Sequence, residues 1–175
     1  MKTLVRPAHE NDIPRLTEIY NHHVVNGHST FQLEPQTIEQ RIKAFNRFAL
    51  TGRYRMLVAE QDDRVVGSAS SFKYRAGSVF ERTVETGIYL DHRIMGKGIG
   101  SQLYHSLFKI LAEEDIHLAV VGIALPNDSS IALHQKFGFK QVGVFDEYAY
   151  VAGKYYSSIW LQKRLNETLQ KASSS

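Results

Sequence analysis

The chain has 175 residues, a length typical of one domain. Its 21 Lys and Arg residues and 18 Asp and Glu residues leave a formal charge of +3, far less than a dedicated nucleic-acid-binding protein concentrates on one face. The sequence contains no cysteine, which excludes a disulfide framework, a Cys-based zinc site, a c-type haem and a Cys nucleophile. The N-terminal residues lack the apolar segment of a signal peptide, and no apolar run approaches the roughly 20 residues of a membrane helix. We therefore expect a cytoplasmic protein that binds neither membranes nor nucleic acids.

The first half of the chain predicts two helices between strands. Residues 3–5 form a short strand, and apolar residues at helical spacing predict a helix over 13–24. After a loop over 26–35, Thr37 and Gln40 form a possible capping box for a second helix. Three strands are expected at 55–60, 64–73 and 83–90, and the first two form a hairpin.

The second half predicts two more helices and three strands. A helix begins at Gly96–Gly100, an apolar strand covers 118–124, and a further helix begins at 126–128 and ends at Gly138. Residues 140–165 form two strands around Ala152-Gly153. The element order β-α-α-β-β-β-α-β-α-β-β predicts an α/β (α+β) fold, in which a mixed sheet carries helices on both faces. We assign residues 1–165 to one domain and 166–175 to a C-terminal tail.

The most informative motif is the run HRIMGKGIGS, from His92 to Ser101, between an expected strand and an expected helix. The unpaired amides and the dipole of a helix start favour an anion, and glycines let the backbone approach a phosphate closely. Arg93 and Lys97 add positive charge. The spacing matches neither the G-x-x-x-x-G-K-[ST] pattern nor the G-x-G-x-x-G pattern. A tight strand–helix connection is the alternative, but the three alternating glycines and two cations favour a phosphate-binding loop.

Two motifs together resemble the GNAT acetyltransferase superfamily. The pattern R-x-x-G-x-G-x-G from Arg93 to Gly100 is similar to the family's pyrophosphate loop, which binds acetyl-CoA. The segment NDSSIALHQKFGF, from Asn127 to Phe139, resembles the family's N-x-x-[SA]-x-x-L-x-x-x-x-G-F helix. The resemblance implies a GNAT-like, mostly antiparallel, twisted sheet, acetyl-CoA as co-substrate, and no metal.

A narrower resemblance points to the phosphinothricin and methionine sulfoximine N-acetyltransferases. It is carried by the sequences IYNH at 19–22, STF at 29–31, RTVE at 82–85 and LH at 133–134. It implies transfer of the acetyl group to the α-amine of a small amino acid analogue, and a homodimer. Direct attack in a ternary complex is expected because no Cys nucleophile is available. The sequence GKYYS at 153–157 departs from the subfamily's G-[RK]-W-x-D.

Glu85 is the candidate catalytic base. On a strand it shares a face with Gly87 and Tyr89, and Gly87 leaves room for a substrate. A carboxylate in the middle of an apolar strand has a raised pKa, which suits a base near neutral pH. An ion pair with Arg82 or another cation is the alternative role of Glu85.

His134 is the second candidate catalytic residue. It lies about two helical turns after Asn127 and shares its helix face. Many GNAT proteins place a tyrosine here as the acid that protonates the CoA sulfur. His134 therefore acts as that acid, orients the substrate, or is a partly buried helix histidine.

The remaining site residues fall into two groups. Backbone contacts at the strand end and in the glycine loop, with an oxyanion contact from the Leu90 amide, are what the resemblance implies for acetyl-CoA. The expected acetyl-CoA ligands are Ile88, Tyr89, Leu90, Arg93, Gly96, Lys97, Gly98, Ile99, Gly100, Ser101, Asn127 and Lys136. Cations around a short loop could bind a carboxylate or phosphinate between two aromatic walls. The expected substrate contacts are Lys73, Arg75 and Arg82, with Phe31 and Tyr89 as walls.

Two other functions stay open. One is the same transfer to another amine, such as a protein N-terminus, and the other is a CoA-binding sensor without turnover. A tyrosine cluster near the C-terminus is explained by a dimer interface or by core packing. Its members are Tyr148, Tyr150, Tyr155 and Tyr156.

Overall fold

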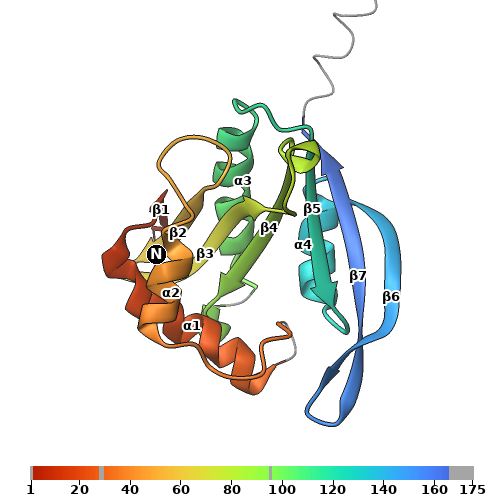
Figure 1. The fold of residues 1–175 in the computed structure, drawn as a ribbon. Coiled ribbons are helices and arrows are strands. Elements are labelled where there is room, and N and C mark those ends of the chain that lie inside the picture. Colours follow the sequence, from red (N-terminus) through yellow and green to blue (C-terminus); the bar gives the residue numbers. More distant parts are fainter. Residues whose placement is uncertain (1, 28–29, 95, 166–175) are drawn as a thin grey trace, which may run out of the picture.

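The computed structural model describes residues 2–27, 30–94 and 96–165, so the expected tail over 166–175 lies outside the described residues. Its strands form one sheet in the order β1-β2-β3-β4-β5-β7-β6 (Figure 1). Strands β4 and β5 are parallel, and the other neighbouring pairs are antiparallel. The mixed, mostly antiparallel sheet is thereby confirmed. The strands are β1 (Leu4–Pro7), β2 (Met56–Gln61), β3 (Arg64–Lys73), β4 (Thr83–Leu90), β5 (Leu118–Ala124), β6 (Lys140–Val151) and β7 (Lys154–Arg164).

Helices cover both faces of the sheet, as the sequence predicted. Figure 1 shows α1 (Ile13–Asn26) and α2 (Ile38–Phe45) on the near face, and α3 (Ile99–Leu111) and α4 (Asp128–Lys136) on the far face. The capping box of α2 is confirmed, because the Thr37 hydroxyl accepts from the Gln40 N–H at 3.2 Å and Gln40 Oε1 accepts from the Thr37 N–H at 2.9 Å. None of the helices in the described part of the chain is long and apolar enough to cross a membrane.

Alternation along the strands divides the core between the two faces. Leu57 and Ala59 of β2 pack into the larger core with α3, whereas Val58 packs into a smaller core with α1. The apolar face of α3 is fully buried at Leu103, Leu107 and Leu111. This burial fixes α3 against the sheet, and with it the loop that precedes the helix.

Strands β4 and β5 separate in the middle of the sheet. Their parallel pairing runs from Thr83 opposite Leu118 to Glu85 opposite Val120. Beyond Glu85, β4 pairs with β3 as far as Leu90, and β5 pairs with β7 as far as Ala124. The sheet is therefore split between β4 and β5 from residue 86 onward.

Backbone groups of β4 alternate between β3 and this split. The Asp91 N–H donates to the Val66 carbonyl of the neighbouring strand at 2.9 Å, so positions 91, 89 and 87 bond to β3. The N–H and C=O groups of Ile88 and Leu90 consequently face the split. The Leu90 carbonyl accepts a hydrogen bond there from His23 Nε2 at 2.8 Å.

The hairpin of β6 and β7 forms the far edge of the sheet, and it turns at Ala152-Gly153 as predicted. Tyr148, Tyr150 and Tyr155 are 50%, 63% and 62% exposed. Core packing is therefore the wrong explanation for these three tyrosines.

Candidate active site

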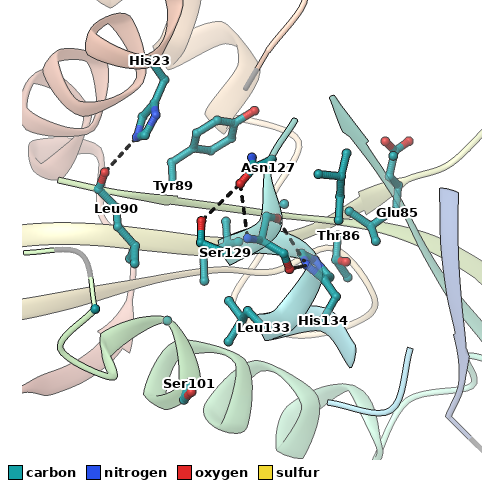
Figure 2. A pocket seen from close by; sticks show the side chains of 18 of the residues that line it. His23, Glu85, Thr86, Tyr89, Leu90, Ser101, Asn127, Ser129, Leu133 and His134 are labelled. Carbon is teal, nitrogen blue, oxygen red and sulfur yellow. Dashed lines mark hydrogen bonds between the residues drawn. The ribbon is translucent and has the colours of Figure 1, made fainter. Parts of the chain in front are cut away.

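The split between β4 and β5 opens into a cavity of about 380 Å³ (Figure 2). Its walls come from β4, from β5, from the loop that precedes α3, and from α4. Ten of the residues singled out from the sequence line this cavity: Glu85, Ile88, Tyr89, Leu90, Gly96, Gly98, Gly100, Ser101, Asn127 and His134. The two motifs therefore meet at one place in the fold, as their combination predicted.

The three glycines of the loop serve two different purposes. Gly96 and Gly98 have φ angles of 79° and 77°, in the left-handed region that favours glycine. A Cβ on Gly100 would lie 3.1 Å from Leu133 Cδ2 and 3.4 Å from Ile88 Cδ1, so the helix can approach β4 and α4 closely. Ile99 is buried in the core, which leaves only its backbone to face a ligand. The start of α3 therefore presents backbone amides without intrahelical partners, and no side chain among the described residues caps them.

Arg93 is engaged by the protein itself. Its Nε and Nη2 donate to the Asp91 carboxylate at 2.9 and 2.6 Å, and Arg15 of α1 donates to the same carboxylate. Asp91 is buried, and the Arg93 hydrogen bonds hold the pKa of its carboxyl far below the usual value. Phosphate binding by Arg93 and by the exposed Lys97 stays a prediction, because neither side chain lines the cavity.

Lys136 does not line the cavity, but it is joined to Ser101, which does. Lys136 Nζ donates to Ser101 Oγ at 3.0 Å, which links α4 to the first turn of α3. Asn127 caps α4, because its Oδ1 accepts from the Ser130 N–H at 3.2 Å. Asn127 therefore has a structural role as the cap of α4, and its contact with acetyl-CoA stays a prediction.

Glu85 lies where β4 and β5 begin to separate. Burial raises the pKa of its carboxyl, because the charged form loses hydration. Among the residues that the structure describes, the Glu85 side chain forms no hydrogen bond and no ion pair. Arg82 instead pairs with Asp115 at 2.7 Å, so the ion pair considered for Glu85 and Arg82 is wrong.

Space beside Glu85 is kept open by Gly87. A Cβ on Gly87 would meet Phe72 Cε1 at 3.4 Å and Ser70 Oγ at 3.7 Å, which is ordinary contact. Tyr89, two residues further, packs edge-on against Tyr20 of α1 with ring centroids 5.0 Å apart. Glu85 and Tyr89 thus lie on the α1 side of β4, and Figure 2 shows both beside the cavity.

His134 is 1% exposed and has both ring nitrogens bonded. Nδ1 lies 2.7 Å from the Ser130 carbonyl, which only accepts, so Nδ1 carries a proton. Burial lowers the pKa of His134 and favours the neutral ring, so Nε2 accepts from the Tyr104 hydroxyl at 2.7 Å. Tyr104 was missed in the sequence, where it is one apolar position among several on α3.

The comparison with known families now decides what this arrangement is. Residues 5–160 match the model of the acetyltransferase (GNAT) domain. The chain belongs to the GNAT acetyltransferase family.

Relatives of this GNAT domain are similar over nearly their whole length. A phosphinothricin N-acetyltransferase from Streptomyces coelicolor is 41% identical over 92% of this chain and 95% of its own. An L-methionine sulfoximine/L-methionine sulfone acetyltransferase from Salmonella typhimurium is 29% identical over 93% of this chain and 95% of its own. The crystal structure of a GNAT superfamily phosphinothricin acetyltransferase from Sinorhizobium meliloti in complex with acetyl-CoA has a TM-score of 0.89, with 28% identity over 95% of this chain and 90% of that one.

The observed geometry of this GNAT domain fits acetyl-CoA. The uncapped amides at the start of α3 suit its phosphates, and the cleft-facing backbone of Ile88 and Leu90 suits an extended chain that carries amide groups. Tyr89 contributes its side chain rather than its backbone, since its N–H and C=O bond to β3.

The expected substrate contacts lie outside this cavity, except for Tyr89. Arg75 stacks over Tyr74 and Phe80, with its guanidinium carbon 4.9 and 5.9 Å from the ring centres. Lys73 is exposed at the end of β3, and Phe31 packs edge-on against Tyr148 of the hairpin at 5.5 Å. Substrate binding by Phe31, Lys73, Arg75 and Arg82 therefore stays a prediction. His23 lines the cavity and was not predicted to do so.

Proposed function

We propose that this GNAT protein is an N-acetyltransferase that moves the acetyl group of acetyl-CoA to the α-amine of a small amino acid analogue, of the phosphinothricin or methionine sulfoximine type. The observation that carries the proposal is Glu85, a half-buried carboxylate without a partner among the described residues, where β4 and β5 separate. The names of the two relatives support the substrate class.

The binding of acetyl-CoA is assigned to the backbone around the split. Acetyl-CoA supplies the acetyl group as a thioester. The amides from Gly98 to Ser101 hold its phosphates, and the N–H and C=O groups of Ile88 and Leu90 hold the pantetheine amides. Asn127, Lys97 and Lys136 contribute polar contacts at the rim. Of the backbone groups on β4, the Leu90 N–H is reserved for the acetyl oxygen, where it stabilises the negative charge that develops, so the pantetheine amides are held by the other groups of Ile88 and Leu90.

Glu85 accepts the proton that the amine loses when its nitrogen attacks the thioester, directly or through one water. A raised pKa brings the carboxylate closer to the pH at which the enzyme works, which makes it a stronger base than an exposed glutamate. The nitrogen–carbon bond forms first, and collapse of the tetrahedral species then breaks the carbon–sulfur bond and releases CoA as its thiolate, in a single complex of protein and both substrates. His134, with both nitrogens bonded, orients the residues around the reacting end.

The test is a thiol-release assay with acetyl-CoA and a panel of acceptors. We expect turnover with phosphinothricin, methionine sulfoximine or methionine sulfone, and slower turnover with short peptides that present a free N-terminus. Turnover with peptides alone would favour a protein N-terminus as acceptor. Unchanged acetyl-CoA binding with no turnover on any acceptor would favour a sensor.

The exposed β6–β7 hairpin supports a homodimer. Its exposed side chains form an apolar and aromatic surface on the edge of the sheet: Val142, Val144, Phe145, Tyr148, Tyr150 and Tyr155. Such a surface is typical of an interface. We expect native mass spectrometry to give the mass of two chains, and Tyr150→Glu combined with Tyr155→Glu to shift the protein toward the mass of one chain.

The cytoplasmic location likewise stays a prediction, which cell fractionation would check.

A further inference from the structure

Arg41 of α2 is a cation that neither the sequence motifs nor the proposed mechanism uses. Its guanidinium carbon lies 4.4 Å from the centre of the Tyr20 ring, over the face of that ring. The Gln36 side-chain oxygen lies 3.4 Å from its Nη1, a long hydrogen bond. No carboxylate pairs with Arg41 in the described ranges, 2–27, 30–94 and 96–165. A half-buried guanidinium is ordinarily stabilised by an anion, and burial lowers the pKa of Arg41 accordingly.

Tyr20, the residue beneath this cation, connects it to the wall of the cavity. Tyr20 packs its edge against Tyr89, and its hydroxyl lies 3.0 Å from the Thr30 hydroxyl. We call Tyr20, Thr30, Arg41 and Tyr89 the Arg41 cluster. A guanidinium among hydroxyl donors is chemically suited to bind a carboxylate.

The Tyr89 hydroxyl connects this cluster to Glu85. Burial raises the pKa of Tyr89 to about 12, and the charges of Arg41 and Glu85 act on it in opposite directions. The geometry that joins the two is a chain of contacts: Arg41 lies over Tyr20, Tyr20 packs against Tyr89, and Tyr89 lines the cavity together with Glu85. Among the described residues, Arg41 has no carboxylate partner and Glu85 has no cation partner.

We propose that the Arg41 cluster binds the α-carboxylate of an amino acid substrate while Glu85 receives the proton of its α-amine. An α-amino acid carries both groups on one carbon, so their two binding sites must be neighbours. This inference rests on the proposed function and narrows it to acceptors with a free α-carboxylate. The cations Lys73, Arg75 and Arg82 would then be left for an anionic side chain, such as a phosphinate.

The experiment compares an amino acid with its own carboxamide. Methionine sulfone α-amide replaces the carboxylate by a neutral carboxamide of similar size, and kcat/KM is measured for both compounds with saturating acetyl-CoA. We expect the native protein to prefer the free acid. Arg41→Met should lower kcat/KM for the acid by about 10- to 100-fold, the loss of one charge-assisted hydrogen-bonded pair, and change the value for the amide less than about 3-fold.

Two further variants control for folding and for general loss of positive charge. Arg47→Met removes an exposed arginine just after α2 and should leave both values unchanged. Arg41→Lys keeps the positive charge but lacks the planar guanidinium that can donate two parallel hydrogen bonds. Its preference for the acid over the amide should lie between that of the native protein and that of Arg41→Met. If Arg41→Met does not fold, the Lys variant alone decides the question.

An unchanged preference for the acid in a folded Arg41 variant that still binds acetyl-CoA would overturn the assignment. If the native protein acetylates neither compound, the proposed function fails by itself. Titration calorimetry with CoA present then tests the cluster separately. Binding of the acid and not of the amide by the native protein, lost in Arg41→Met, supports the cluster, and equal binding of both compounds rejects it.

Discussion

At the scale of single residues, the cavity holds two titratable groups whose pKa values burial shifts in opposite directions. Burial raises the pKa of Glu85 and lowers that of His134, so both neutral forms are favoured. The consequences differ because Glu85 has no partner among the described residues, whereas His134 is bonded at both nitrogens. Glu85 can therefore take up a proton without breaking an existing hydrogen bond, whereas His134 would have to break its hydrogen bond to the Ser130 carbonyl to give up a proton.

Replacing Glu85 by Gln should lower kcat by about 10²- to 10⁴-fold and leave acetyl-CoA binding unchanged. The carboxylate is the active form, so native activity should fall as pH decreases through the raised pKa, at a higher pH than for an exposed glutamate. The residual rate of the variant should lack this step. Burying a charge destabilises the native state above that pKa, so the melting temperature of Glu85→Gln at pH 7 should be unchanged or higher. A pH profile identical to that of the native protein would contradict the role of Glu85.

Replacing His134 by Gln should affect stability more than chemistry. We expect a loss of about 1–3 kcal/mol in the free energy of unfolding, because Tyr104 and the Ser130 carbonyl lose a partner. We expect kcat to fall less than about 10-fold. Urea unfolding and steady-state kinetics measure the two effects, and Tyr104→Phe serves as the control that removes one bond only. A fall in kcat as large as that of Glu85→Gln would instead make His134 the acid.

At the scale of elements, the glycine loop is tied to α1 through one carboxylate. Arg15 of α1 and Arg93 of the loop both bind Asp91, which lies at the end of β4 and is buried. His22 of α1 also stacks on His92, with ring centroids 3.8 Å apart. The position of the loop therefore depends on α1, although the two are about 70 residues apart in the sequence.

Replacing Asp91 by Asn should lower the free energy of unfolding at pH 7 by about 3 kcal/mol, because two guanidinium groups lose their anion. Arg93 and Arg15 hold the pKa of Asp91 below its ordinary value. Its stabilising effect is therefore present above about pH 4 and is lost as pH falls through the lowered pKa. Urea unfolding at pH 7, 5 and 3 should give a difference from the native protein that shrinks at pH 3. The exposed Asp63→Asn serves as the control, and a difference that does not depend on pH would contradict the role of the charge.

At the scale of the whole molecule, patterns local in sequence predicted the elements and much of the site. Periodicity and caps located the strands and helices, and the glycine loop, Glu85 and Asn127 could be recognised because each belongs to a motif within one element. Tertiary pairing could not be recognised in this way. Asp91 lies only two residues before Arg93, but nothing local shows that it is buried and shared with Arg15, and Arg41 reads as one polar helix residue until α2 packs over Tyr20. Helix packing and ion pairing across elements have no signature at a fixed spacing, so His23, Arg41 and Tyr104 were not found from the sequence.

Where β4 and β5 separate, the backbone groups of Ile88 and Leu90 have no neighbouring strand in the described part of the chain and are open to a ligand. Hydrogen exchange should therefore alternate along β4 in the free protein. The amides of Gly87 and Tyr89, bonded to β3, should exchange slowly, and those of Ile88 and Leu90 should exchange faster. Acetyl-CoA should slow Ile88 and Leu90 and leave the other two almost unchanged, as residue-resolved exchange by NMR would measure. Equal protection of all four amides before the ligand is added would contradict the open edge. The bound cofactor would then act as the strand that the sheet lacks at this position, and its departure would return β4 to a half-paired edge.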